Sequence, residues 1–358
     1  MRNDIPRREF LKTSAAVAGG MAIGLGGNFV ARAADEETIK KTRSYNGDMQ
    51  YRRLGKTGIW VSSVCMGGHW KRVGEVTKHN IPAVSLPKGA DNMAVLRKNR
   101  SDVLTRCMEV GINYIDACTE AEISVYGPAL KGRRDSMYMG FAMWPNCPRN
   151  AKYRTADALL KKLEEGLKRA EVDYVDVWRL VASTPGRHSP GDEEEFIKAF
   201  EKAKEQGKAR FTGVSSHGRQ WLKRLAENYP EHFQVLLFPY TAGTKELPKD
   251  SLFDAVRKHD VGTFGIKPFS SNSLFQRAKS AEEKDKLARM TLRHILGNPA
   301  ITAPIPGLAC VEEVDNAAAA VKELALNVSE ARELETASKD MWANLSPGYE
   351  WLKDWEYV

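Results

Sequence analysis

The stretch from 111 to 135, GINYIDACTEAEISVYGPALKGRRD, holds the clearest strand-and-helix unit of the chain. Its first part is apolar and β-prone, and Asp116 falls at the expected C-terminal end of a strand. A helical pattern follows and closes at Gly132. Because Asp116 ends a buried strand and Glu120 follows it closely, this unit predicts a place where chemistry occurs.

Working outward, strand and helix patterns alternate along most of the chain. Strands are expected at 61–66, 112–116, 137–143, 174–181, 210–214, 234–238, 262–267 and 301–305. Helices are expected at 93–110, 155–170, 193–206, 220–227, 251–259, 282–296 and 311–324. Eight such units in one domain predict a (β/α)8 TIM barrel. No Gly-x-Gly-x-x-Gly follows the first strand, which argues against an open doubly wound sheet.

The ends of the predicted barrel carry additional segments. Residues 49–60, with Gly55 and Gly58 around a Lys-Thr pair, have the pattern of a hairpin. A further helix is expected at 329–343, and the chain ends in an aromatic tail from 349 to 358. We expect this tail to cover apolar barrel surface, with a role in lining a ligand site as the alternative. The polar segment 70–91 is expected to be a long loop.

Composition narrows the classes of function. The chain has 358 residues, of which 42% are hydrophobic and 28% charged, typical of a globular protein. Of its net charge of +8, three charges belong to residues 1–33 and the rest are spread along the chain. No basic stripe alternates with aromatic residues, so no nucleic-acid partner is expected. The five cysteines form no C-x-x-C pair, so no metal site of the usual cysteine type is expected either.

The N-terminus has the pattern of an export signal. Arg7 and Arg8 precede a weakly apolar, glycine-rich run at 13–30, and Ala31-Arg32-Ala33 offers a small-x-small cleavage site. This predicts a twin-arginine signal peptide at 1–33, recognised by the twin-arginine export machinery and removed in a periplasm-like compartment. The alternative is a transmembrane anchor, but five glycines make the run weakly apolar, so no stable membrane span is expected after cleavage.

Four spaced blocks together resemble the aldo-keto reductase family. They are YRRLGKTG at 51–58, VSSV at 61–64, MGG at 66–68 and GINYID at 111–116. The resemblance extends over about 49–335, and it implies a barrel whose bottom is capped by the hairpin. It leaves 34–48 as a linker and 336–358 as a C-terminal helical extension. The family's activity implies reduction of a carbonyl substrate with NADP(H).

Only part of the family's catalytic set has a match. The family uses a tyrosine to protonate the carbonyl oxygen, a lysine paired with an aspartate, and a histidine that orients the carbonyl. Asp116 matches the aspartate. The tyrosine position falls on Thr119 or Ala121, the lysine position on Ala142 and the histidine position on Val181. The resemblance therefore implies a non-standard acid/base set.

Other residues are candidates for the missing roles. Tyr126 is a candidate acid, with packing on a helix face as the alternative. His217 and His69, each at the end of a predicted strand, are candidates to join Asp116 or Glu120 in an acid/base group or a metal site. The sequence favours the alternative that the two histidines are separate polar residues at a wet rim.

The cofactor residues are matched in part. Ser215 matches the family residue that holds the nicotinamide amide. Lys267, Gly307 and Asn316 fall where the family holds the phosphates, the last near the start of a helix. The Arg that usually faces the adenosine 2′-phosphate has no clear match, and Glu312 and Glu313 would repel that group, so the choice between NADP and NAD stays open.

Two functions follow from these patterns. The first is an exported, NADP-linked oxidoreductase of aldo-keto reductase type that acts on a carbonyl or alcohol of unknown identity. The second is a barrel without the reductase reaction, either a ligand-binding protein or an acid/base or metal enzyme of another class.

Overall fold

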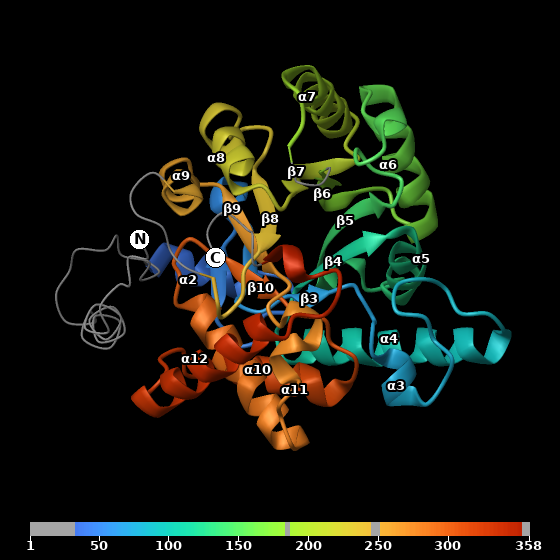
Figure 1. The fold of residues 1–358 in the computed structure, drawn as a ribbon. Helices are drawn as coiled ribbons and strands as arrows, with labels where there is room; N and C mark the ends of the chain where they lie inside the picture. The colour runs from blue at the N-terminus through green and yellow to red at the C-terminus, as the bar shows by residue number, and fades with distance from the viewer. Residues whose placement is uncertain (1–32, 183–186, 245–250, 353–358) are drawn as a thin grey trace.

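Eight parallel strands form a closed barrel in the computed structural model, which describes residues 33–182, 187–244 and 251–352 (Figure 1). The strands follow one another in chain order: β3 (Met66–Gly67), β4 (Tyr114–Thr119), β5 (Tyr138–Trp144), β6 (Val175–Val181), β7 (Ala209–Ser215), β8 (Val235–Pro239), β9 (Gly262–Ile266) and β10 (Ala303–Ile305). A parallel bridge between Gly67 and Gly307 closes the ring. The predicted (β/α)8 barrel is therefore confirmed.

Helices cover the outside of the barrel, as the periodicity of the sequence predicts. They are α4 (Ala90–Glu109), α5 (Glu120–Ala129), α6 (Ala156–Ala170), α7 (Pro190–Glu205), α8 (Arg219–Asn228), α9 (Leu252–Lys258), α10 (Ala281–Leu296) and α11 (Val311–Ala319). In α6, Leu159, Leu163 and Leu167 are all buried on the face toward the strands. The hydroxyl of Thr155 accepts the amide of Ala158 and caps the helix start.

The predicted first strand at 61–66 is wrong in its bounds. Residues Trp60–Ser62 form β2, which pairs antiparallel with β1 (Tyr51–Arg53), and the barrel strand β3 begins only at Met66. The hairpin takes the first half of the predicted strand because it closes the bottom of the barrel. Leu54 and Val61 from the hairpin are fully buried in the same apolar cluster as the inward-facing strand residues.

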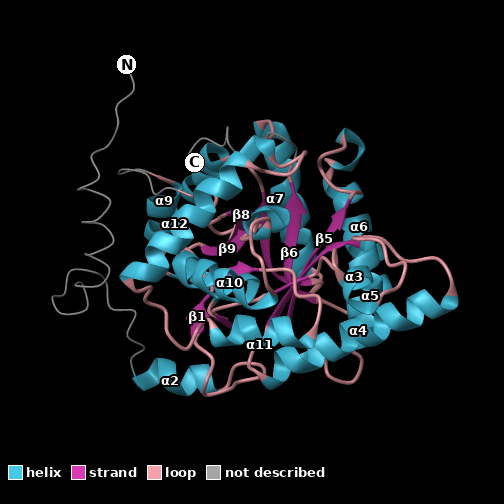
Figure 2. Ribbon diagram, turned by 60° about the horizontal axis from the view of Figure 1, so that its bottom comes forward, coloured by secondary structure: helices cyan, strands magenta, loops and turns pink. Residues whose placement is uncertain are grey.

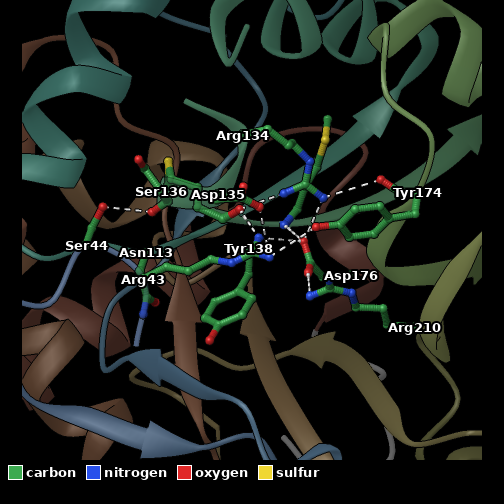
Figure 3. Close-up of polar contacts among 12 residues, drawn as sticks. Arg43, Ser44, Asn113, Arg134, Asp135, Ser136, Tyr138, Tyr174, Asp176 and Arg210 are labelled. Atoms are coloured by element: carbon green, nitrogen blue, oxygen red, sulfur yellow. Dashed lines mark hydrogen bonds and ion pairs between the residues drawn. The ribbon is translucent and has the colours of Figure 1, made fainter. Parts of the chain in front are cut away.

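The segment before the hairpin is packed against the barrel. It begins with α2 (Ala33–Lys40), which lies at the edge of the molecule (Figure 2). Arg43 then reaches the buried carboxylate of Asp176 at 3.1 Å, and Arg134 and Arg210 contact the same carboxylate at 2.8 and 3.3 Å (Figure 3). The part of the predicted 34–48 linker around Arg43 therefore forms part of the bottom of the barrel.

Two segments beyond the regular units shape the mouth of the barrel. The predicted loop 70–91 contains a short helix, α3 (Val73–Thr77), and is anchored by the fully buried Trp70, whose indole nitrogen donates to the carbonyl of Pro82 at 2.7 Å. The predicted C-terminal extension at 336–358 begins inside α12 (Val328–Ala343), and its described part also contains a 3-10 turn at Glu350–Leu352. Within the described residues, no helix combines the length and apolar character needed to cross a bilayer. The predicted signal peptide at 1–33 lies almost entirely outside them.

Candidate active site

A cavity of about 450 Å³ lies at the carboxyl ends of the strands, which is where barrels of this class place their sites. Every barrel strand except β8 contributes to its wall directly or through the residues just after it. The residues that carry its chemistry include Asp116, Cys118, Arg179, Ser215, His217 and Lys267. The loop 70–91 adds Val84 to one side of the cavity.

The centre of the cavity wall is an ion pair between Asp116 on β4 and Arg179 on β6. Nε and Nη2 of Arg179 each donate to one carboxylate oxygen at 2.7 Å, and both side chains are more than nine-tenths buried. Burial would lower the pKa of Arg179, but the carboxylate of Asp116 outweighs burial, and the pKa lies above its ordinary value. The third nitrogen, Nη1, is buried without a hydrogen-bond partner among the described residues.

Sequence reasoning missed Arg179, although the sequence contains a signal for it. Strand β6 reads VDVWRLV, and every residue in it is buried. A charged side chain in the second half of a buried strand requires a partner or a ligand near the carboxyl end of the barrel.

The wall next to this ion pair is apolar. Ala142 and Val181, the positions where the family resemblance places a lysine and a histidine, belong to one small cluster with Cys147. Cys118 and Trp144 pack against that cluster. This side of the cavity therefore provides shape and excludes water, and no ionisable side chain stands at either position.

His69 pairs with Glu122, and the predicted pairing with Asp116 or Glu120 is wrong. The imidazole Nδ1 of His69 is hydrogen-bonded to the fully buried carboxylate of Glu122. That carboxylate also accepts hydrogen bonds from the backbone amides of Cys118 and Thr119. Glu122 is the third residue of α5 and forms a capping box with Thr119, the residue before the helix.

The two predicted partners of His69 are bound elsewhere. Both oxygens of Asp116 accept hydrogen bonds from Arg179, as described above. Glu120 points outward and accepts from the amide of Asn146 at 2.5 Å. Among the described residues, no group of three or more His, Cys, Asp or Glu side chains has a metal-binding arrangement.

His217 lines the cavity at the end of β7 and is held in its neutral form. Its ring stacks on Trp351 with centroids 4.0 Å apart and planes 11° apart. Burial, together with the positive charges of Lys267 and Arg149, lowers the pKa of His217 to about 3. At neutral pH this imidazole therefore carries no extra proton to donate.

Tyr126 lies in the core rather than at the cavity. It is fully buried, its hydroxyl donates to the carbonyl of Gly68 at 2.7 Å, and its ring packs against Trp70. Burial raises the pKa of Tyr126 to about 12. The prediction of Tyr126 as a surrogate acid is corrected here, because a helix face packed on the barrel keeps its hydroxyl away from the cavity.

Three of the four predicted cofactor residues share the cavity. Ser215, Lys267 and Gly307 line it, at the ends of β7, β9 and β10. Asn316 does not: its amide nitrogen donates to the carbonyl of Asp285 at 3.0 Å, which ties it to α10. The prediction for Asn316 is corrected for this reason.

The cavity wall carries an excess of positive charge. Lys71, Arg149 and Lys267 line it, and none of them forms an ion pair with a carboxylate in the part of the chain that the structure describes. Burial lowers the pKa of Lys267, the most enclosed of the three. Such a wall favours an anionic group, for example a phosphate or a carboxylate.

Eight parallel strands that alternate with helices and close into a ring form a (β/α)8 barrel, and the cavity lies at the carboxyl ends of those strands. Within that class, the aldo/keto reductase family model matches residues 89–286, which is more than half of the chain. The chain belongs to the aldo/keto reductase family, and the resemblance seen in the sequence is confirmed.

Curated relatives are distant. An L-glyceraldehyde 3-phosphate reductase from Escherichia coli K12 is 24% identical over 253 residues, which are 64% of each chain. The protein thus spans less than two thirds of this relative's length. An oxidoreductase of Bacillus subtilis, YqkF, is 23% identical over 280 residues, covering 68% of this chain and 89% of the relative.

Solved structures share the fold. An aldo-keto reductase from Klebsiella pneumoniae in complex with NADPH has a TM-score of 0.62 and 20% identity, covering 80% of this chain and 94% of the other. The holo form of AKR11C1 from Bacillus halodurans has a TM-score of 0.60 and 19% identity, covering 84% and 99%.

Proposed function

We propose that this protein is an NADP-linked oxidoreductase that interconverts a small carbonyl compound and its alcohol in the cavity described above. The observation that carries the proposal is the buried ion pair of Arg179 and Asp116. It fixes a guanidinium at the wall of a cavity in an aldo/keto reductase fold. A positive charge held there is suited to an oxygen that becomes more negative as the reaction proceeds.

The residues present fit the nicotinamide and phosphate portions of NADP(H). Ser215 matches the family residue that holds the nicotinamide amide, Gly307 falls where the family holds the phosphates, and Lys71, Arg149 and Lys267 bring positive charge to the same cavity. When bound, the cofactor supplies or accepts a hydride. The Klebsiella relative, solved with NADPH, supports this choice of cofactor.

Residues of the chain would then have two roles, stabilising the substrate oxygen and excluding water. The positive charge of Arg179 would stabilise the substrate oxygen, while Asp116 holds the guanidinium through Nε and Nη2. The apolar wall around Val181 and Trp144 would keep water from the reacting carbon.

A ligand-binding protein without turnover is the second candidate. It is favoured by the ion pairs at the site: Asp116 is committed to Arg179 and Glu122 to His69, so neither carboxylate is free to act as a base. The positive charges of Lys71, Arg149 and Lys267 would also suit a protein that only binds an anionic ligand.

A binding titration with NADPH, NADP⁺ and NADH, followed by a carbonyl-substrate screen, separates the two candidates. We expect binding of NADP(H), and Lys267→Met should weaken it about tenfold by removing one charge-assisted contact. Lys88→Met removes an exposed lysine outside the cavity and serves as the matched control. Nucleotide binding with no turnover of any carbonyl would favour the ligand-binding role, and an absence of nucleotide binding would refute the proposed cofactor.

We also propose that the protein is exported. The support is the sequence at 1–33, with Arg7 and Arg8 ahead of a glycine-rich apolar run and a small-x-small site. Export by the twin-arginine route places the folded protein in the periplasm.

A further inference from the structure

The C-terminal extension brings a tyrosine to the mouth of the cavity. Tyr349 lines the cavity together with Lys71 and Lys267. Nζ of Lys71 donates to the phenol oxygen at 3.0 Å, and Nζ of Lys267 lies 5.1 Å from the centre of the ring. A phenol between two ammonium groups, facing a cavity, has the surroundings of a group that exchanges a proton.

The tail that carries Tyr349 is fixed in place. The amide of Ser346 donates to the hydroxyl of Ser273 at 3.2 Å, which ties the tail to the segment after β9. Two residues beyond Tyr349, Trp351 stacks on His217 at the end of β7. The position of the phenol is therefore set by contacts on both sides of it.

The segment after β9 has an unusual backbone at the same place. Lys267 and Ser271 both adopt left-handed conformations, with φ of 59° and 55°. Ser271 also accepts a hydrogen bond from Nζ of Lys71 at 3.2 Å. Non-glycine residues in this region are strained and cluster at functional sites. Here these left-handed conformations place Lys267 and Ser271 next to Tyr349.

We propose that Tyr349 is the proton-transfer residue of this cavity, positioned by Lys71 and Lys267. The proposal rests on the proposed carbonyl–alcohol reaction. It supplies the proton donor for that reaction, because the family's tyrosine position is occupied here by Thr119 or Ala121. Tyr349 replaces a tyrosine that the family holds after its second strand with one from the far end of the chain.

The electrostatics agree with this assignment. Burial would raise the pKa of Tyr349, but the charge of Lys267 and the hydrogen bond from Lys71 outweigh it and bring the pKa to about 8. Ser271 contributes in the same direction. Tyr126, which has no lysine beside it, shows the opposite effect, since burial raises its pKa to about 12.

The step balances as follows. In reduction, the carbonyl carbon receives the hydride from reduced nicotinamide, the π electron pair moves to oxygen, and that oxygen takes the phenol proton of Tyr349. The phenolate is stabilised by the ammonium of Lys71 and recovers a proton from solvent at the cavity mouth. Alcohol oxidation is the same sequence reversed, with the phenolate of Tyr349 as the base.

The first test needs no cofactor. Ultraviolet difference absorbance follows the formation of tyrosinate among the 11 tyrosines of the chain as pH rises. We expect one phenol to ionise near pH 8, below the ordinary value of 10.0. Tyr349→Phe should remove this step, Lys71→Met should move it upward, and Lys71→Arg should restore it.

Tyr153 provides a matched control for the titration. It also lies near two lysines, with Nζ of Lys152 and Lys162 at 4.7 and 5.5 Å from its ring centre, but it is not among the residues that line the cavity. Tyr153→Phe should leave the step near pH 8 in place. Superimposable curves for the wild type and Tyr349→Phe would overturn the proposal.

The second test separates this proposal from the proposed function. With a carbonyl substrate and NADPH, Tyr349→Phe should lower kcat about 100-fold with NADPH affinity unchanged. The wild-type reduction rate should fall as pH rises through about 8, because the protonated phenol is the donor. If the wild type turns over and Tyr349→Phe matches it in kcat and pH profile, the assignment of Tyr349 fails while the oxidoreductase stands. A tyrosinate step near pH 8 without turnover of any carbonyl would refute the oxidoreductase and, with it, the role of Tyr349 in proton transfer.

Discussion

Arg179 on β6 holds both carboxylate oxygens of Asp116 on β4, with two hydrogen bonds of 2.7 Å. The aspartate expected from the family therefore pairs with an arginine from the second strand along rather than with a lysine at position 142, where this chain has alanine. Both residues also line the cavity, so the pair fixes two strands relative to each other and places charge at the site.

Breaking this pair should be strongly destabilising. Arg179→Met leaves the buried carboxylate of Asp116 without its partner, and we expect the free energy of unfolding to fall by about 3–5 kcal/mol. Urea denaturation of purified protein measures this. The matched control is Asp102→Ala, which removes an exposed pair with Lys98 and should cost less than about 1 kcal/mol. Equal losses for the two variants would contradict the prediction.

Arg43 should contribute to stability from outside the predicted barrel. Its guanidinium reaches the carboxylate of Asp176, which is 1% exposed, and the carbonyl of Met137 at 2.6 Å. We expect Arg43→Ala to lower the free energy of unfolding by about 1–3 kcal/mol, since hydrogen bonds to charged groups are lost. Lys41→Ala, which removes a pair that is mostly exposed, is the control. An unchanged urea midpoint for Arg43→Ala would show that the segment is only a linker.

His217 should make the protein less stable in acid. Its pKa in the folded protein is about 3, below the ordinary 6.5, so the unfolded chain binds a proton that the folded protein does not. Stability is therefore lost as pH falls from about 6.5 toward 3. We expect His217→Asn to reduce the slope of unfolding free energy against pH between about pH 4 and pH 6. An unchanged slope, measured by urea denaturation across that range, would show that the imidazole is protonated in the fold.

The export proposal is tested at the N-terminus. Changing Arg7 and Arg8 together to lysine keeps the charge but removes the twin-arginine pair, and we expect the full-length protein to accumulate in the cytoplasm. Fractionation and immunoblotting of the two forms measure this. Changing Arg2 alone to lysine is the control, and it should leave cleavage and export intact. Continued export of the double variant would refute the twin-arginine proposal.

The local parts of the fold follow from the sequence. The helix expected at 155–170 is found at Ala156–Ala170, because leucines every four residues and a threonine cap specify it within the segment itself. The strand expected at 174–181 is found at Val175–Val181 for a similar local reason. Alternation of such units is enough to define the barrel.

The bounds of the first barrel strand could not be predicted from local sequence alone. Residues 60–62 are apolar and β-prone in either arrangement, and only the closing of the barrel bottom by Leu54 and Val61 assigns them to the hairpin. Tyr126 is a similar case, since the sequence places it on a helix near the site but does not show that its hydroxyl points into the core.

What the sequence by itself determined is the barrel, the aspartate of its second strand, and Ser215, Lys267 and Gly307 around one mouth. The strand expected to end at Asp116 continues to Thr119. Only the tertiary structure decided which side chains meet there. Arg179 and Asp116 are 63 residues apart, and Lys71 and Tyr349 are 278 residues apart. Periodicity and spacing report on neighbours along the chain, whereas pairs at such separations are set by the order and closure of the strands and by where the tail packs.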